Sequence, residues 1–199
     1  MLAIGTDRRE IEIWSTATWQ RLHTLPRHSV SVNDLAFSTD GASLLSVGER
    51  REETAGVKRL PEVFLWNTDS SKKIREIHLS HWTMTAQHVI FVGQALAVVG
   101  NHGGQLTMID TNTGGVVGEL EGHQNMIGGL AYDERNNLLI STSPEQTILW
   151  DMNCRKKAAP MSGSGFVAYT PKTGLIATAP IGTDQKTCIL SRVVIGRTP

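Results

Sequence analysis

"VFLWNTDSSKKI", residues 63–74, is one of four similar stretches in a chain of 199 residues. The others are "IEIWSTATWQRL" at 11–22, "LTMIDTNTGGVV" at 106–117 and "TILWDMNCRKKA" at 147–158. They align without gaps on Trp14, Trp66, Ile109 and Trp150, and Leu190 is a candidate fifth anchor. The residues before each anchor alternate between apolar and other types, which is the period of a strand with one buried face. The recurrence predicts one repeated structural unit, in which each anchor ends a strand.

A second element recurs upstream of each anchor. The stretches at 27–48 and 122–141 share a histidine, an apolar residue four positions later and a Leu-Ala-aromatic triplet, and looser copies begin at Ser80 and Ser162. Each stretch reads as a strand, a polar turn and a second strand, because the turn residues favour tight-turn geometry. One unit therefore contains about four short strands. No window sustains a helical period, so the sequence predicts an all-β fold without long helices.

The anchor spacing and two short motifs resemble the WD40 repeat family. After a longer first interval the anchors recur every 40 to 45 residues or so, about the length of a repeat that forms one four-stranded propeller blade. The family's Gly-His and Trp-Asp pairs are reproduced by Gly122-His123 and Trp150-Asp151. The other units keep parts of this signature, such as Asp110 after an isoleucine. The resemblance implies a WD40-like β-propeller of about 4.5 to 5 four-stranded blades, in a closed or an incomplete ring.

The repeat divides the chain 1–199 into units of a single propeller domain. Their approximate bounds are 1–25, 26–77, 78–120, 121–161 and 162–199. The chain starts at what reads as the second strand of one blade and ends shortly after the third strand of another. We therefore expect a ring that closes on itself, a fragment that joins further WD40 repeats, or open blades that associate with a second copy.

In WD40 repeats a loop histidine, a strand hydroxyl, a turn aspartate and the tryptophan commonly form a hydrogen-bonded brace. By this resemblance Ser141 supplies the hydroxyl of one unit, and Glu145 lies one residue away from the acid position. In the unit 78–120, Val99 and Gly103 replace the hydroxyl and the acid, so we expect a softer unit without a brace. The residues to which the resemblance gives structural roles are His28, His81, His123, Trp14, Trp66, Trp150, Asp110 and Asp151.

Catalytic and metal-binding patterns are absent from the sequence. It contains no GxSxG, GxxxxGK[ST] or HExxH motif and no strand-to-helix GxGxxG. His78 and His81 form the only HxxH pair, and no acidic residue nearby completes a metal site. We therefore predict no catalytic residue, no cofactor and no metal. The competing interpretation, an enzyme that uses a central propeller pocket, requires a convergent polar set that the sequence does not show.

Charge and composition restrict the partners. Nineteen basic and nineteen acidic residues cancel, so net charge does not recruit nucleic acid. The longest apolar stretch, 89–100, is too short to span a bilayer, and charges at 7–9 interrupt a signal peptide. Cys154 and Cys188 belong to no CxxC pair and form either free thiols or one disulfide. The sequence predicts a cytoplasmic protein with no nucleic acid or membrane partner.

The long first interval between anchors indicates an insertion at 49–62. The segment "GERREETAGVKRLPE", residues 48–62, carries four acidic and four basic residues, and Gly56 is placed to turn an extended hairpin. The hairpin is either a solvated feature without a partner or a binding element, since loops on a rigid scaffold often carry binding residues.

Propeller topology places this hairpin on the same side as the loops between blades. Trp82 either joins a binding surface there or packs between blades. We therefore predict a noncatalytic scaffold that binds other proteins or peptides; a truncated fragment without its own function is the alternative. The candidate partner-binding face consists of Arg27, Arg50, Arg51, Lys58, Arg59, Trp82, Asn101 and His102.

Overall fold

The computed structural model describes residues 1–52, 58–79, 82, 84–161, 165–170, 173–179 and 189–192. These residues form five antiparallel sheets of consecutive strands. The first sheet contains β1 (Leu2–Gly5), β2 (Ile11–Trp14) and β3 (Arg21–Leu25). The second contains β4 (Ser31–Phe37), β5 (Ser43–Glu52), β6 (Lys58–Asn67) and β7 (Lys73–Ile77).

The remaining strands repeat the same up-and-down order. The third sheet contains β8 (Ala86–Val92), β9 (Leu96–Asn101), β10 (Leu106–Asp110) and β11 (Val116–Leu120). The fourth contains β12 (Gly129–Asp133), β13 (Leu138–Thr142), β14 (Thr147–Asp151) and β15 (Lys156–Met161). The fifth contains β16 (Phe166–Thr170), β17 (Leu175–Ala179) and β18 (Ile189–Arg192). The all-β prediction is confirmed, and none of the described residues belongs to a helix that could span a bilayer.

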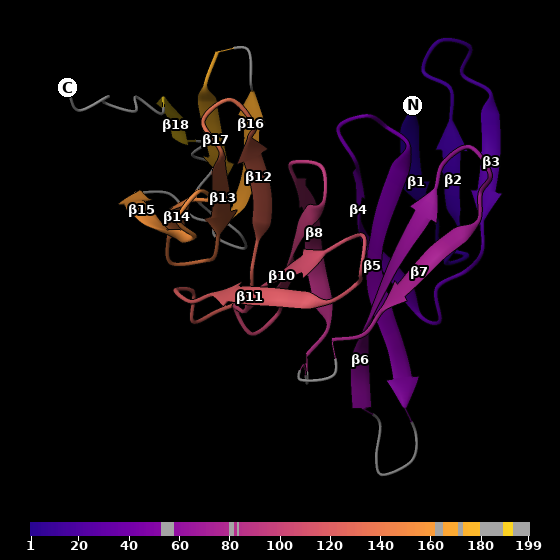
Figure 1. Ribbon diagram of the computed structural model, residues 1–199, viewed down its shortest axis with the longest axis horizontal. Coiled ribbons are helices and arrows are strands. Elements are labelled where there is room, and N and C mark those ends of the chain that lie inside the picture. Colours follow the sequence, from indigo (N-terminus) through magenta and orange to yellow (C-terminus); the bar gives the residue numbers. More distant parts are fainter. Residues whose placement is uncertain are drawn as a thin grey trace.

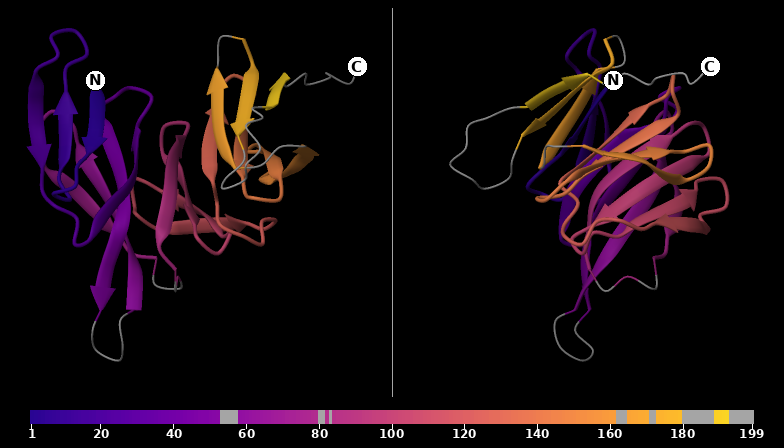
Figure 2. Two further views of the ribbon diagram at one scale, coloured as in Figure 1. Left: turned by 180° about the vertical axis from the view of Figure 1, so that it is seen from behind. Right: turned by 90° about the vertical axis from the view of Figure 1, so that its left-hand side faces the viewer.

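The sheets stand side by side in an arc, each beside the next in the chain (Figure 1). The first strands of successive sheets are neighbours, since β4 contacts β8, β8 contacts β12 and β12 contacts β16. Figure 2 shows the first and fifth sheets at opposite ends of this arc. The strands are therefore arranged like those of propeller blades around an axis, and the described residues do not close the ring.

The hydrophobic core consists of four layers, one between each pair of consecutive sheets. Trp66 packs with Ile11, Ile13 and Leu25 of the preceding sheet, and its side chain is almost fully buried. Ile109 and Trp150 pack in the same way against the sheets that precede theirs. Trp14 is only half-buried, because no described sheet precedes the first one. The anchor of each repeat thus joins two blades.

The anchors also mark a break in strand pairing. The register of the last two strands of a sheet shifts immediately before the anchor, between Ile13 and Trp14 in the first sheet, and likewise before the anchors of the next three sheets. A β-bulge bends its strand and increases the local right-handed twist. The repeated bulge explains why the copies align without gaps, since each blade takes the same twist at the same residue.

The turn after each anchor needs one residue with a left-handed backbone. Trp19, Ser71, Gly114 and Arg155 hold equivalent places in the four turns, with φ values of 56°, 58°, 77° and 56°. Only one of them is glycine, the residue that adopts this conformation most easily. The turn geometry is therefore maintained by the flanking strand pairs rather than by a particular residue type.

The insertion lengthens two strands instead of forming a separate loop. β5 and β6 are 10 residues long each and pair out to Glu52 and Lys58, within the inserted segment 49–62. Their free ends project beyond the other sheets (Figure 1). The extended hairpin is confirmed, whereas Gly56, expected at its turn, lies outside the described residues.

Gly48 provides a test of the close packing at the base of the hairpin. A Cβ atom there would lie 2.0 Å from the Ser31 carbonyl oxygen and 2.7 Å from His28 Nδ1. We expect Gly48→Ala to lower the free energy of unfolding by about 3 kcal/mol, because backbone must move. Urea unfolding followed by tryptophan fluorescence measures this loss. Gly115→Ala is the control, since the nearest atom to its Cβ is the movable Thr113 hydroxyl at 3.3 Å; equal losses would contradict the packing argument.

Candidate functional site

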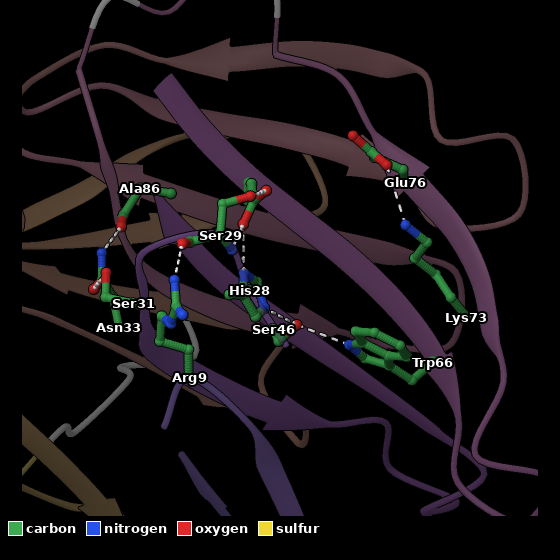
Figure 3. A network of polar contacts seen from close by, with 11 residues as sticks. Arg9, His28, Ser29, Ser31, Asn33, Ser46, Trp66, Lys73, Glu76 and Ala86 are labelled. Atoms are coloured by element: carbon green, nitrogen blue, oxygen red, sulfur yellow. Dashed lines mark hydrogen bonds and ion pairs between the residues drawn. The ribbon is translucent and has the colours of Figure 1, made fainter. Parts of the chain in front are cut away.

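A buried brace holds the second sheet to the loop before it (Figure 3). Ser46 Oγ on β5 lies 2.8 Å from Trp66 Nε1 on β6 and 2.8 Å from Nε2 of His28 in the preceding loop. The indole N–H donates to the hydroxyl, so the hydroxyl hydrogen is available for Nε2. The imidazole hydrogen then lies on Nδ1, which faces Glu62. His28, Ser46 and Trp66 therefore form a hydrogen-bonded brace in the second sheet.

Glu62 is the acid of this brace, a role that the sequence analysis missed. Its Oε2 lies 3.2 Å from His28 Nδ1 and accepts from the Ser29 backbone N–H at 2.8 Å, while the Ser29 hydroxyl donates to Oε1. Burial raises the pKa of this carboxyl, but the hydrogen bonds from His28 and Ser29 outweigh burial and lower it. Glu62 lies in a lengthened strand rather than in a turn, so motif spacing could not identify it. The available signal was its position across from Gly48, which leaves room for the imidazole.

The fourth sheet repeats only part of the brace. His123 Nε2 and Trp150 Nε1 each lie 2.7 Å from Ser141 Oγ, as expected from the resemblance. Glu145 does not reach the histidine; it is exposed and accepts hydrogen bonds from Asn125 and from the Ser143 hydroxyl. Nδ1 of His123 is consequently buried without a hydrogen-bond partner. Burial, and then the nearby Lys157 charge, lower the pKa of His123 to about 4.

The third sheet uses a different contact, which corrects two predictions for the binding face. Trp82 is 1% exposed within the core between the second and third sheets, and its Nε1 donates to Thr107 Oγ1 at 3.0 Å. Asn101 is fully buried, and its Oδ1 accepts from the backbone N–H groups of Gly103 and Gln105. Neither side chain is accessible to a partner, so the packing alternative for Trp82 is correct. His81 lies outside the described residues, and the expected softness of this unit remains a prediction.

The remaining motif residues stabilise single strands and turns. Trp14 Nε1 donates to Glu12 within β2. Asp110 Oδ1 accepts from the backbone N–H groups of Asn112 and Thr113, and the bond from Thr113 contributes most to lowering its pKa. Asp151 makes the corresponding bond to the Asn153 N–H. The acidic residues after the anchors therefore close turns, and they do not take part in the brace.

The other candidate binding residues divide between paired and unpaired side chains. Arg27 is exposed and pairs with Glu10 at 2.9 Å, and Arg59 is exposed and pairs with Glu49 at 3.4 Å. Arg50, Arg51 and His102 are exposed as well. Lys58 lies in β6, but its side chain is outside the described residues.

The fold changes the charge that the hairpin presents. Glu49 and Glu62 are each only 7% exposed, whereas Arg50, Arg51 and Arg59 are exposed. A segment with balanced charges in the sequence therefore presents a basic surface over its described side chains.

The described residues of the whole chain include no group of three His, Cys, Asp or Glu residues that could hold a metal ion. Cys154 is exposed, and Cys188 lies outside the described range.

Glu62→Gln tests whether this carboxylate stabilises the second sheet. The glutamine amide has a single oxygen, so it cannot replace both carboxylate oxygens that contact Ser29 and His28. We therefore expect a loss of about 2 kcal/mol in the free energy of unfolding. Glu145→Gln is the matched control in the fourth sheet, where the carboxylate does not contact the histidine, and should change stability by less than about 0.5 kcal/mol. Chemical denaturation of both variants makes the comparison. Similar losses would show that Glu62 has no special structural role.

The lowered pKa of His123 predicts a loss of stability in acid. Below an ordinary pKa of 6.5 the unfolded chain binds a proton that the folded chain, with a pKa of about 4, does not bind. The contribution of the neutral His123 to the free energy of unfolding is therefore fully present above pH 6.5 and is lost toward pH 4. The loss is about 2 kcal/mol between pH 7 and pH 5. Comparing the intact chain with His123→Asn at both pH values isolates this group, because all other titrating groups are shared. A difference between the two proteins that does not shrink on acidification would refute the assignment.

Comparisons with known proteins agree with this architecture. Residues 19–51 match the family model of the WD domain, G-beta repeat. This match runs from the turn before β3 into β5, so the sequence repeat combines the last strand of one sheet with the first strands of the next. The WD40 β-propeller domain of Doa1 superposes with a TM-score of 0.70 and 17% identity, over 88% of this chain and 55% of that one.

Two curated relatives are longer proteins. Elongator complex protein 2 of Danio rerio is 39% identical over 49 residues, which are 25% of this chain and 6% of that protein. WD repeat and FYVE domain-containing protein 1 of Mus musculus is 27% identical over 139 residues, which are 68% of this chain and 31% of that protein. This chain therefore spans less than a third of the length of either relative. The repeat match, the sheets and the propeller superposition lead to one conclusion: the chain contains a WD repeat at residues 19–51 and has the fold of WD40 propeller blades.

Proposed function

We propose that the chain is a noncatalytic scaffold that binds other proteins through the β5–β6 hairpin and the loop that carries His28. The observation that carries this proposal is the anchorage of a projecting basic hairpin by the buried contact between Glu62 and His28. A hairpin held in this way loses little conformational freedom when a partner binds. The family supports the class of function, since WD40 proteins commonly act as interaction scaffolds.

The exposed hairpin side chains suit an acidic partner surface. Arginine is enriched where interfaces concentrate binding energy, because its planar fork makes several directed hydrogen bonds. Arg50, Arg51 and Arg59 occur on two short segments of neighbouring strands. Side chains of the same sign on one element attract an oppositely charged surface and accelerate association at low ionic strength. We place the protein in the cytoplasm as part of this proposal.

Shortening the hairpin tests the proposal. Residues 51–59 are replaced by Asn-Gly, which joins the paired residues Arg50 and Leu60 by a two-residue turn and retains Glu62. We expect the shortened chain to keep its unfolding midpoint but to lose the proteins that the intact chain captures in a quantitative pull-down. Lys72→Gln, at an exposed turn residue between β6 and β7, is the matched control and should capture the same proteins. Equal capture by the shortened and intact chains would overturn the assignment of the binding face.

A further inference from the structure

A pocket of about 390 Å³ opens beside the hairpin, between the first and second sheets. It is lined by Arg9 from the β1–β2 turn, by Ser29 and Val30 from the loop before β4, and by Arg51 from β5. Two arginines from segments far apart in the sequence thus line the same open pocket. The pocket volume is at the lower end of the range typical of small-ligand sites.

Arg9 occupies its place at a conformational cost. Its φ of 68° is in the left-handed region, which a bulky side chain seldom adopts, and the corresponding turn of the third sheet has Gly104 there with φ 87°. The guanidinium Nη1 donates to the Ser29 carbonyl oxygen at 2.6 Å (Figure 3). This contact joins two of the residues that line the pocket. Because strained backbone often occurs at functional sites, this arginine is a candidate binding residue.

Arg51 lies directly opposite another arginine. It pairs across the hairpin with Arg59, and like charges in directly opposed positions destabilise a β-ladder. Arg59 is directed to Glu49, which leaves the Arg51 charge without an acidic partner among the described residues. An anion bound at Arg51 would relieve this repulsion.

The acidic groups around the pocket already have partners. Glu10 pairs with Arg27, Glu49 with Arg59, and Glu62 with His28 and Ser29. Asp7, in the same turn as Arg9, forms no ion pair with either pocket arginine within the described part of the chain. The pocket therefore carries two positive charges that the described acidic side chains do not neutralise.

We propose that this pocket binds a phosphorylated serine or threonine of the partner protein. A phosphate monoester carries nearly two negative charges at neutral pH and several acceptor oxygens, so it matches two guanidinium groups, whereas a carboxylate matches one. Arginine also presents a planar fork that binds phosphate oxygens in pairs. This inference rests on the proposed function, because it names the chemistry by which the scaffold recognises its partner.

The test measures peptide binding to the full chain by fluorescence anisotropy. The probes are three labelled, degenerate peptide pools that differ only at the central position, which is phosphoserine, serine or glutamate. We expect the phosphoserine pool to bind at least about tenfold more tightly than the other two, as two charge-assisted contacts would provide. Serine binding equal to phosphoserine would overturn the proposal, and glutamate binding equal to phosphoserine would overturn the assignment to phosphate.

Matched variants localise the binding to the pocket. Arg51→Gln and Arg9→Asn should each weaken the phosphoserine pool about tenfold, and asparagine is used at position 9 because it tolerates the left-handed backbone. Arg8→Gln is the control, since this exposed arginine lies in the same turn as Arg9 and does not line the pocket. Equal weakening by Arg8→Gln and Arg51→Gln would refute a specific pocket. Arg9→Lys, which retains the charge but removes the fork, replaces Arg9→Asn if the latter unfolds, and weaker binding by this variant supports the proposal.

The two proposals fail separately. If the hairpin replacement abolishes protein capture while all three peptide pools bind equally poorly, the scaffold function stands and phosphate recognition is rejected. If the phosphoserine pool binds the pocket but the shortened hairpin still captures every protein, the proposed binding face is wrong.

Discussion

The structure depends on the burial of each repeat's anchor against the sheet that precedes it. Trp66, Ile109 and Trp150 are each nearly inaccessible, and each packs in the layer between two sheets. Burying a side chain of this size contributes on the order of 2 to 3 kcal/mol, and a single blade has no second surface on which to obtain it. The half-burial of Trp14 follows from the same constraint, because no described sheet lies before it. Stability in this chain is therefore shared between neighbours.

The polar brace adds specificity to this packing. In the second and fourth sheets one serine hydroxyl satisfies both a tryptophan N–H and a histidine nitrogen, so the loop before the sheet has one preferred position. The two sheets differ in the acid: Glu62 completes the brace of the second, whereas the fourth leaves Nδ1 of His123 without a partner. The lengthened hairpin and the complete brace occur in the same sheet. The contact between Glu62 and His28 anchors the base of the hairpin, which explains how the long hairpin can retain a defined direction.

The candidate binding surface shows how a fold redistributes charge. The sequence at 48–62 is balanced, yet folding buries Glu49 and Glu62 against basic or hydrogen-bonding partners and leaves three arginines exposed. Arg9 and Arg51 line the pocket beside the hairpin, although the net charge of the chain is zero. Net charge therefore does not describe the local charge of this surface.

The sequence by itself determined the repeat, its short strands and turns, and the anchor that ends a strand in each unit, because these follow from local alternation and a spacing that every unit must satisfy. It also indicated the hairpin, since one interval was longer than the others. Only the tertiary structure decided which side chains meet. It buries Asn101, which was expected on the binding face, decides between the two alternatives for Trp82, and brings Glu62 to His28. The physical reason is that burial of a loop residue, or the partner of a strand residue, depends on the neighbouring sheet. That neighbour is distant in sequence, and no local pattern specifies its distance or orientation.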